Sequence, residues 1–201
     1  MAHFLNVKWL TFLLLFTDFP GAALEDVDYR SDRELDKTLI TRLGTCNYIQ
    51  DCRNIILLGA TGSGKTWLSN AFGNAACRNF YTVRYVRLPD LLAELSASRA
   101  EGTYQKVMKA YKQVKLLILD EWLLYPVSEG DVRDILEITD RRHKAGSTIF
   151  CSQMDIGGWH EWLGGATIAD AICDRIAHDS YTLVIKGKES MRKQNGISAK
   201  P

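Results

Sequence analysis

The sequence predicts an α/β fold in which helices cover both faces of a parallel sheet. Three observations support this. Short apolar runs alternate with amphipathic segments of helix length along most of the chain. Each run is apolar throughout, which is typical of strands buried on both faces of a parallel sheet. The first run is followed directly by a glycine-rich segment, GATGSGKT, which leads into a helical pattern.

The first half of the fold is expected to open with a helix and then to hold two strands. Ser31 and Glu34 form an S-x-x-E capping box, and Leu35, Leu39 and Leu43 follow at four-residue spacing. This pattern indicates an amphipathic helix. The elements predicted after it are a strand at 54–58 (NIILL), a helix from the glycine-rich segment to about Cys77, a strand at 82–86, and helices at 90–99 and 104–113.

The second half begins with the apolar strand 116–119 (LLIL), which leads to Asp120-Glu121. Ser128 with Asp131 can cap a helix that turns Val132, Ile135 and Leu136 inward and ends near Gly146. At its end Arg141-Arg142-His143-Lys144 carries charges that complement the helix dipole at a solvated surface. The elements predicted beyond it are a strand at 148–151, a helix at 168–178 and a strand at 181–185.

Length and composition are those of one globular domain. The chain has 201 residues, of which 46% are hydrophobic and 24% charged. We expect the domain to span residues 21–195, between a hydrophobic leader at 1–20 and a tail at 196–201. The formal net charge of +1 excludes a strongly cationic surface. Any DNA contact must therefore come from local clusters or from several subunits together.

The glycine-rich segment, residues 59–66, matches the phosphate-binding pattern G-x-x-x-x-G-K-[ST]. Gly59 lets the chain turn off the strand, and Gly64 lets the backbone approach a phosphate. Backbone N–H groups here form an anion site at the positive end of the next helix. Lys65 is expected to reach the β- and γ-phosphates of ATP, and Thr66 to hold Mg²⁺. The full nucleotide-binding segment is Gly59, Ala60, Thr61, Gly62, Ser63, Gly64, Lys65, Thr66 and Trp67.

Two further polar positions follow predicted strands. Asp120 ends a buried strand, so it is expected beside the phosphate loop, where it can hold Mg²⁺. Glu121 faces differently and can orient or deprotonate the attacking water. A pair of solvated carboxylates is the alternative, which the nearby phosphate loop disfavours. Gln153 follows the strand at 148–151 and can contact the γ-phosphate, or it can simply cap a turn.

Together these features resemble a known family. The phosphate loop, the Asp-Glu strand, the strand ending at Gln153 and the later AICDR (171–175) resemble the AAA+ ATPases of the IstB/DnaC group. The IstB branch, the helper ATPases of insertion-sequence transposition, is the most similar. The stretches that carry this likeness are LEDVDY (24–29), RYV (84–86), LLILDE (116–121) and GSTI (146–149), and the similarity extends over roughly residues 19–195.

The resemblance implies a Mg²⁺-dependent ATPase of the cytoplasm that assembles as a homo-oligomer on DNA with little sequence preference and activates a transposase. DNA and oligomerisation are expected to stimulate hydrolysis. It implies that Lys65 and Glu121 are catalytic, that Gln153 is the sensor on the fourth strand, and that Arg175 is an arginine finger for a neighbour's ATP. The alternative for Arg175 is an ion pair with Asp174 or a surface charge. Arg192 matches a nucleotide-sensing position.

Two departures concern the ends of the chain. Members of the group usually carry a helical N-terminal domain, and here residues 1–18 stand in its place, so a truncated copy with weakened assembly is one interpretation. The run WLTFLLLF at 9–16 resembles a secretory signal but is too short to span a bilayer. A buried helix or a wrongly defined reading-frame start is favoured, with no stable membrane association. No sizeable helical lid is expected after Ile185, as in the IstB/DnaC branch.

Three functions remain open from the sequence. The leading one is an ATP-dependent helper of transposition. A DnaC-like helicase loader shares the fold, and a nucleotide-switched scaffold with little hydrolysis is the third. Four lysines recur every three residues at positions 106, 109, 112 and 115. On a helix they spiral around the axis, so a solvated surface is favoured over a DNA-facing segment.

Overall fold

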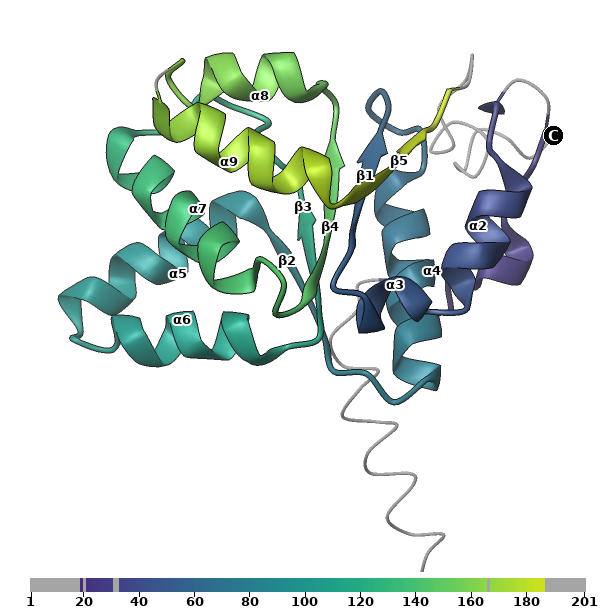
Figure 1. Ribbon diagram of the computed structural model, residues 1–201, viewed down its shortest axis with the longest axis horizontal. Helices are drawn as coiled ribbons and strands as arrows, with labels where there is room; N and C mark the ends of the chain where they lie inside the picture. The colour runs from purple at the N-terminus through teal and green to yellow at the C-terminus, as the bar shows by residue number, and fades with distance from the viewer. Residues whose placement is uncertain (1–18, 20, 31–32, 166, 187–201) are drawn as a thin grey trace, which may run out of the picture.

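The centre of the molecule is a five-stranded parallel sheet with the strand order β2-β3-β4-β1-β5 (Figure 1). A computed structural model describes residues 19, 21–30, 33–165 and 167–186. All four neighbouring strand pairs are parallel, as the apolar runs predicted. The strands are β1 Asn54–Leu58, β2 Val83–Arg87, β3 Leu116–Asp120, β4 Ser147–Ser152 and β5 Ser180–Val184.

Helices cover the sheet on both sides (Figure 1). The layer drawn on the right of the sheet contains η1 Leu24–Asp26, α2 Lys37–Gly44, α3 Asn47–Gln50 and α4 Lys65–Arg78. The layer on the left contains α5 Leu88–Ala100, α6 Tyr104–Gln113, α7 Glu129–Arg142, α8 Ile156–Trp162 and α9 Thr167–His178. The predicted α/β fold, a parallel sheet between two helical layers, is therefore confirmed.

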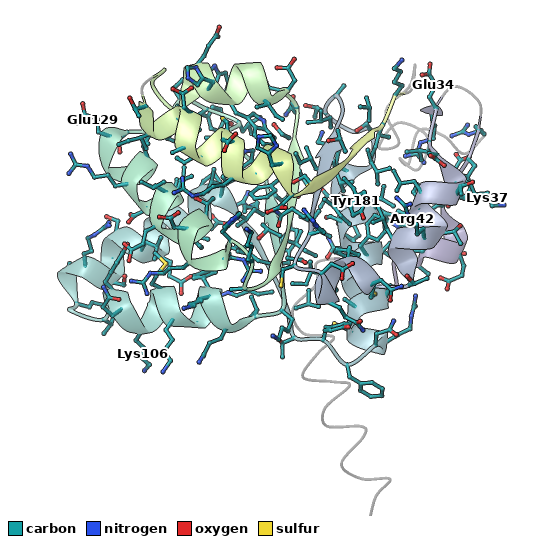
Figure 2. The ribbon with its side chains drawn as sticks, viewed as in Figure 1. Glu34, Lys37, Arg42, Lys106, Glu129 and Tyr181 are labelled. Carbon is teal, nitrogen blue, oxygen red and sulfur yellow. The ribbon has the colours of Figure 1, made fainter. Side chains whose placement is uncertain are left out.

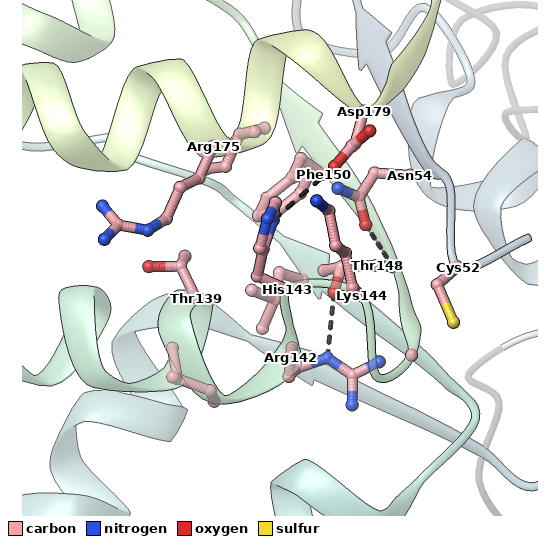
Figure 3. A pocket seen from close by; sticks show the side chains of 14 residues that line it. Cys52, Asn54, Thr139, Arg142, His143, Lys144, Thr148, Phe150, Arg175 and Asp179 are labelled. Atoms are coloured by element: carbon pink, nitrogen blue, oxygen red, sulfur yellow. Dashed lines mark hydrogen bonds and ion pairs between the residues drawn. The ribbon is translucent and has the colours of Figure 1, made fainter.

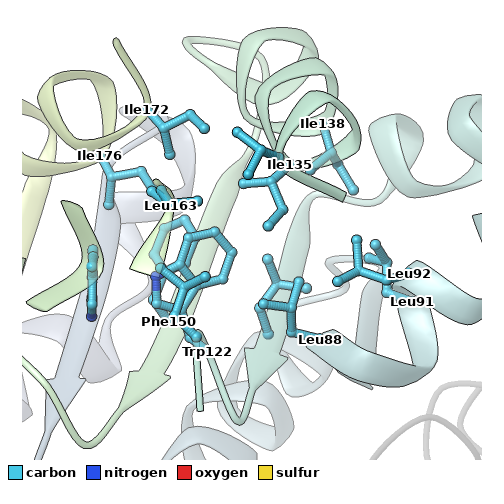
Figure 4. Close-up of a cluster of buried hydrophobic side chains, with 14 of the residues drawn as sticks. Leu88, Leu91, Leu92, Trp122, Ile135, Ile138, Phe150, Leu163, Ile172 and Ile176 are labelled. Atoms are coloured by element: carbon cyan, nitrogen blue, oxygen red, sulfur yellow. The ribbon is translucent and has the colours of Figure 1, made fainter. Parts of the chain in front are cut away.

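Each face of the sheet has its own hydrophobic core, because neighbouring residues of a strand point to opposite faces. Leu117 and Leu119 of β3 join the core under α5–α9, whereas Ile118 joins the core under α2–α4. In the first core the rings of Trp122 and Phe150 meet edge to face with centroids 4.7 Å apart (Figure 4). Because β3 and β4 are buried along their whole length, the residues that follow them have fixed positions.

The N-terminus of α7 has the capping box that the sequence predicted. Ser128 Oγ accepts the backbone N–H of Asp131, and the Asp131 carboxylate accepts the backbone N–H of Ser128. The predicted end near Gly146 is wrong, because α7 ends at Arg142. Beyond it the chain turns back: Lys144 has a φ of 54°, and the N–H groups of Ala145 and Gly146 both donate to the Arg142 carbonyl.

Arg142 differs from the solvated cation that its place at a helix end predicted. The residue is 3% exposed, and its guanidinium donates to the carbonyls of Tyr111 and Val114. Figure 3 shows a further hydrogen bond, to Thr148 Oγ1. Burial lowers the pKa of this group to about 10. Arg142 is therefore a buried residue that connects α7 to the end of α6 and to β4, and it is not a solvated surface cation.

The first long helix begins later than predicted. Asp36 caps α2 by accepting the Leu39 N–H at 2.9 Å, and the helix starts at Lys37. Glu34 lies before it with a φ of 48°, so it cannot act in a capping box, and Ser31 lies outside the described residues. The short helices α3 and α8 were not predicted; α8 contains Gly157 and Gly158, which are poor helix formers.

The predictions about the two ends of the chain fall largely outside the described residues. These include the leader at 1–18, the tail, Arg192, and the absence of a lid, which concerns residues after Lys186. Within the part of the chain that the structure describes, no helix is long and apolar enough to cross a membrane.

Candidate nucleotide-binding site

The glycine loop joins the carboxyl end of β1 to the N-terminus of α4, as the motif predicted. Gly62 and Gly64 have φ angles of 78° and 97°, in the left-handed region that favours glycine. A Cβ on Gly59 would lie 2.6 Å from the Ile185 carbonyl oxygen and 2.7 Å from Ser63 Oγ. Ser63 Oγ is buried without a hydrogen-bond partner among the described residues. Glycine is therefore required at 59 by the packing of the loop itself, and the buried Ser63 hydroxyl group is available to a phosphate.

Lys65 is the first residue of α4, and its side chain is only 9% exposed. Its Nζ donates to the carbonyl oxygens of Gly59 at 2.6 Å and of Ala60 at 3.0 Å. The ammonium group is thus folded back along the loop. It lines a cavity of about 350 Å³, together with Thr66, Asp120, Glu121 and Gln153. The structure therefore brings these predicted site residues to one place.

Asp120 accepts hydrogen bonds from two hydroxyl groups at the same carboxylate oxygen. Thr66 Oγ1 lies 2.7 Å from Asp120 Oδ2, and Tyr85 OH lies 2.8 Å from it. Asp120 is 5% exposed, at the end of β3. Hydroxyl and carboxylate oxygens are the ligands that Mg²⁺ prefers, usually beside water and phosphate oxygens. Thr66 and Asp120 together therefore have the donor chemistry of a magnesium site.

Glu121 follows β3 in a left-handed backbone conformation, with a φ of 53°. Its N–H donates to Asp120 Oδ1 at 2.8 Å, and Glu121 lines the same cavity as Asp120. Glu121 Oε1 lies 3.7 Å from Nη1 of Arg87, at the end of β2. Arg87 also pairs with Asp90 at 2.8 Å, and that hydrogen bond is the main cause that raises the pKa of its guanidinium.

Gln153 is in contact with the glycine loop. Its Oε1 accepts a hydrogen bond from Thr61 Oγ1 at 2.9 Å. The turn that follows is capped by a different residue, Asp155, which accepts the Gly158 N–H at 3.0 Å. Trp67, predicted to extend the nucleotide-binding segment, is half-buried and packs against the core under α2–α4, outside the lining of the cavity.

Arg175 lies on α9, away from the residues that line the site cavity. Its Nε is 2.7 Å from Asp140 Oδ1 of α7, and its Nη1 donates to the Ala171 carbonyl at 2.9 Å. Figure 3 shows it beside Thr139, at a small cavity of about 20 Å³. The Asp174–Arg175 pair considered from the sequence is not the one observed, because Asp174 pairs with His178.

Sequence reasoning missed three residues that contact the site. Tyr85 and Arg87 lie on β2, and Arg33 donates to the carbonyl oxygen of Ser63 in the glycine loop. No local signal marked the first two, because β2 carries two arginines and Tyr85 lies in its middle. Their place at the site follows only from the pairing of β2 with β3.

Comparison with known proteins identifies the family to which this chain belongs. The family model "IstB-like ATP binding protein" matches residues 13–199. The chain belongs to this family. An insertion sequence ATP-binding protein of Sinorhizobium fredii, y4pL, is 41% identical over 173 residues, which are 86% of this chain and 71% of that protein. The insertion sequence IS21 ATP-binding protein of Pseudomonas aeruginosa is 30% identical over 171 residues, 85% of this chain and 64% of the relative.

Solved structures share the fold of this IstB-like chain. The crystal structure of DnaI matches with a TM-score of 0.70 and 23% identity, covering 87% of this chain and 93% of that one. The DnaC helicase loader matches with a TM-score of 0.68 and 20% identity, covering 83% and 97%. At these identities the likeness shows the fold alone, which is the P-loop AAA+ fold predicted from the sequence.

Proposed function

We propose that this IstB-like protein is a Mg²⁺-dependent ATPase of the cytoplasm that helps an insertion sequence to transpose, by assembling on DNA and activating a transposase. The observation that carries the proposal is the convergence of Lys65, Thr66, Asp120 and Glu121 on one cavity of about 350 Å³. The insertion-sequence relatives support transposition over helicase loading, since the DnaC likeness concerns the fold alone.

Each side chain has a distinct part in hydrolysis. The Lys65 ammonium neutralises phosphate charge, and Thr66 with Asp120 would hold Mg²⁺. When bound, the metal neutralises charge that develops on the transferred phosphoryl group. The Glu121 carboxylate orients water and accepts its proton, and its place in the cavity lining suits it to this role. Gln153, already bonded to Thr61 of the loop, orients the attacking water beside it.

Assembly on DNA is the second part of the proposal. The net charge of +1 gives one chain little electrostatic attraction for DNA, so a homo-oligomer that combines several basic surfaces is the better binder. Helix α6 buries Met108 and exposes Lys106, Lys109 and Lys112, and Figure 2 shows Lys106 pointing outward. Such contacts to phosphates carry little sequence preference. The transposase is the proposed protein partner.

A pair of substitutions tests the catalytic part. We expect Lys65→Ala to weaken ATP binding about 10- to 100-fold, because charge-assisted hydrogen bonds to phosphate are lost. Glu121→Gln should keep ATP affinity within about threefold and lower turnover at least about 100-fold. Lys37→Ala, at an exposed position of α2, is the control and should change neither quantity.

Equilibrium titration with ATP and a phosphate-release assay, with and without duplex DNA, supply the measurements. Unchanged ATP affinity in Lys65→Ala would remove the phosphate-binding role of the loop. Normal turnover in Glu121→Gln would remove its role with water. ATP binding without turnover in the unmodified protein, even on DNA, would instead indicate the nucleotide-switched scaffold.

A further inference from the structure

Arg33 connects three segments that are far apart in the sequence. It lies between η1 and α2 and is only 5% exposed. Its Nη1 donates to the Asp28 carbonyl at 3.2 Å, and its Nη2 donates to the Ser63 carbonyl at 2.9 Å. Its own carbonyl accepts the N–H of Lys186, just beyond β5, at 3.2 Å. The Arg33 guanidinium therefore connects the glycine loop to the segment before α2, and the Arg33 backbone connects that segment to Lys186 beyond β5.

The hydrogen bond to Ser63 fixes the orientation of one peptide group in the loop. The Ser63 carbonyl and the Gly64 N–H belong to the same trans peptide, so they point in opposite directions. A carbonyl held by Arg33 therefore directs the Gly64 N–H away from Arg33. Gly64 is the N-cap of α4, and N–H groups at the start of a helix have no partner within it. They are the groups that bind anions.

The same arginine places a second positive charge at the loop. Lys65 is 9% exposed and Arg33 is 5% exposed, so both cations are shielded from water. A buried charge is unfavourable without compensation by hydrogen bonds or by opposite charge. The Arg33 guanidinium donates hydrogen bonds to two backbone carbonyls, and it also interacts electrostatically with the Asp28 carboxylate. A polyanion bound at the loop would add opposite charge near both residues.

From this geometry we propose that Arg33 is a positioning residue for the phosphates of the nucleotide. It holds the Ser63–Gly64 peptide in the orientation that binds phosphate, and it adds positive charge behind the loop. This inference rests on the proposed function and deepens that function. It assigns Arg33 to the polyphosphate chain of the ligand and not to the base.

The test measures affinity for ATP and for inorganic tripolyphosphate, which lacks the base and the sugar. Arg33→Gln should weaken both ligands by the same factor, about tenfold. Its turnover at saturating ATP should stay within about threefold of the unmodified protein, so that KM changes and kcat does not. Arg33→Lys, which keeps the charge, should recover part of the affinity. Lys37→Ala, which removes an exposed cation of α2, is the control.

Three results would overturn the inference. Weakened binding of ATP with normal binding of tripolyphosphate would show that Arg33 serves the base. Normal affinity for both ligands would show that it serves neither. A lower folded fraction, with an unchanged dissociation constant for the protein that remains folded, would show a structural role only. If Arg33→Gln does not fold, Arg33→Lys gives the same comparison, and equal loss for the two ligands is again expected.

The controls separate this inference from the proposed function. If the unmodified protein binds neither ATP nor tripolyphosphate, the nucleotide site itself is wrong. If Lys65→Ala loses binding while Arg33→Gln binds both ligands normally, the site stands and only the role of Arg33 is wrong.

Discussion

Asp120 shows how one buried carboxylate is oriented by three different elements. Thr66 of α4 and Tyr85 of β2 donate to its Oδ2, and the backbone N–H of Glu121 donates to its Oδ1. Hydrogen bonds to a carboxylate are among the stronger ones in proteins. The carboxylate is therefore held in one orientation by groups of the protein itself, which is the arrangement expected of a preorganised site.

Tyr85→Phe tests this orientation at the scale of one atom. The substitution removes only the hydroxyl group that lies 2.8 Å from Asp120 Oδ2. We expect the free energy of unfolding to fall by about 1.5–3 kcal/mol, the usual range for a hydrogen bond to a charged group. The half-saturating Mg²⁺ concentration for turnover should also rise, because the carboxylate is less well oriented.

The control for this prediction is Tyr181→Phe. Tyr181 lies on β5, and its ring is 5.3 Å from the guanidinium carbon of Arg42, a contact that phenylalanine keeps. Urea unfolding and a magnesium titration of ATPase activity provide the two measurements. Equal stability and equal magnesium dependence in Tyr85→Phe and the unmodified protein would contradict a role of Tyr85 at Asp120.

At the scale of elements, the start of α7 depends on local side-chain chemistry. Ser128→Ala removes the hydroxyl that accepts the Asp131 N–H and donates to the Asp131 carboxylate at 2.6 Å. The loss of such a cap costs about 1 kcal/mol of protein stability, within a range of about 0.5–2. Ser96→Ala, at an exposed interior position of α5, should change stability by no more than about 0.5 kcal/mol.

Thermal or urea unfolding measures both serine variants. Because Ser128 lies outside the nucleotide site, the affinity for ATP should be the same in both. A Ser128→Ala protein as stable as Ser96→Ala would show that α7 is held by its packing alone, through Val132 and Ile135, and that its cap contributes nothing measurable.

Elements with a strong local pattern were predictable from the sequence. The bounds of β1 and α6 agree with the prediction at both ends, because an apolar run and an amphipathic period identify them without reference to the rest of the chain. The start of helix α2 was misplaced because Asp36, which the sequence analysis did not consider, is the residue that caps it. Helices α3 and α8 span 4 and 7 residues, which is too short for a helical period to emerge.

The residues of the candidate site also fall into those that the sequence predicted and those that it missed. Lys65, Thr66, Asp120 and Glu121 belong to contiguous motifs, so the sequence could place them together. Arg33 and Tyr85 reach the site through contacts between distant segments, which depend on the strand order and on the packing of the segment before α2. No local pattern encodes those contacts. This explains why residues that orient the site were missed while those of the motifs were found.

At the scale of the whole molecule, the position of Arg175 raises the question of assembly. Its ion pair with Asp140 joins α9 to α7, and the two side chains are 35% and 49% exposed. An exposed pair of this kind is worth roughly 0–1 kcal/mol. In the proposed homo-oligomer, a neighbouring subunit's nucleotide would offer the guanidinium a larger negative charge than Asp140 does, so we expect the pair with Asp140 to be exchanged on assembly.

Three variants distinguish an arginine finger from a structural ion pair. Arg175→Ala should bind ATP normally but hydrolyse it about 10³- to 10⁵-fold more slowly on DNA, the usual contribution of an arginine finger. Asp140→Asn breaks the same ion pair and keeps Arg175, so its turnover should be at least normal. Lys65→Ala subunits are expected to bind ATP only weakly, but they still carry Arg175. When they are mixed with Arg175→Ala subunits, part of the rate should return, because each Lys65→Ala subunit supplies the arginine that an Arg175→Ala neighbour lacks.

Phosphate release from the mixture, with co-assembly on DNA verified by light scattering, is the measurement. A mixture that releases phosphate no faster than Arg175→Ala alone would rule out action between subunits. Equal losses of turnover in Arg175→Ala and Asp140→Asn would show that turnover depends on the Arg175–Asp140 ion pair.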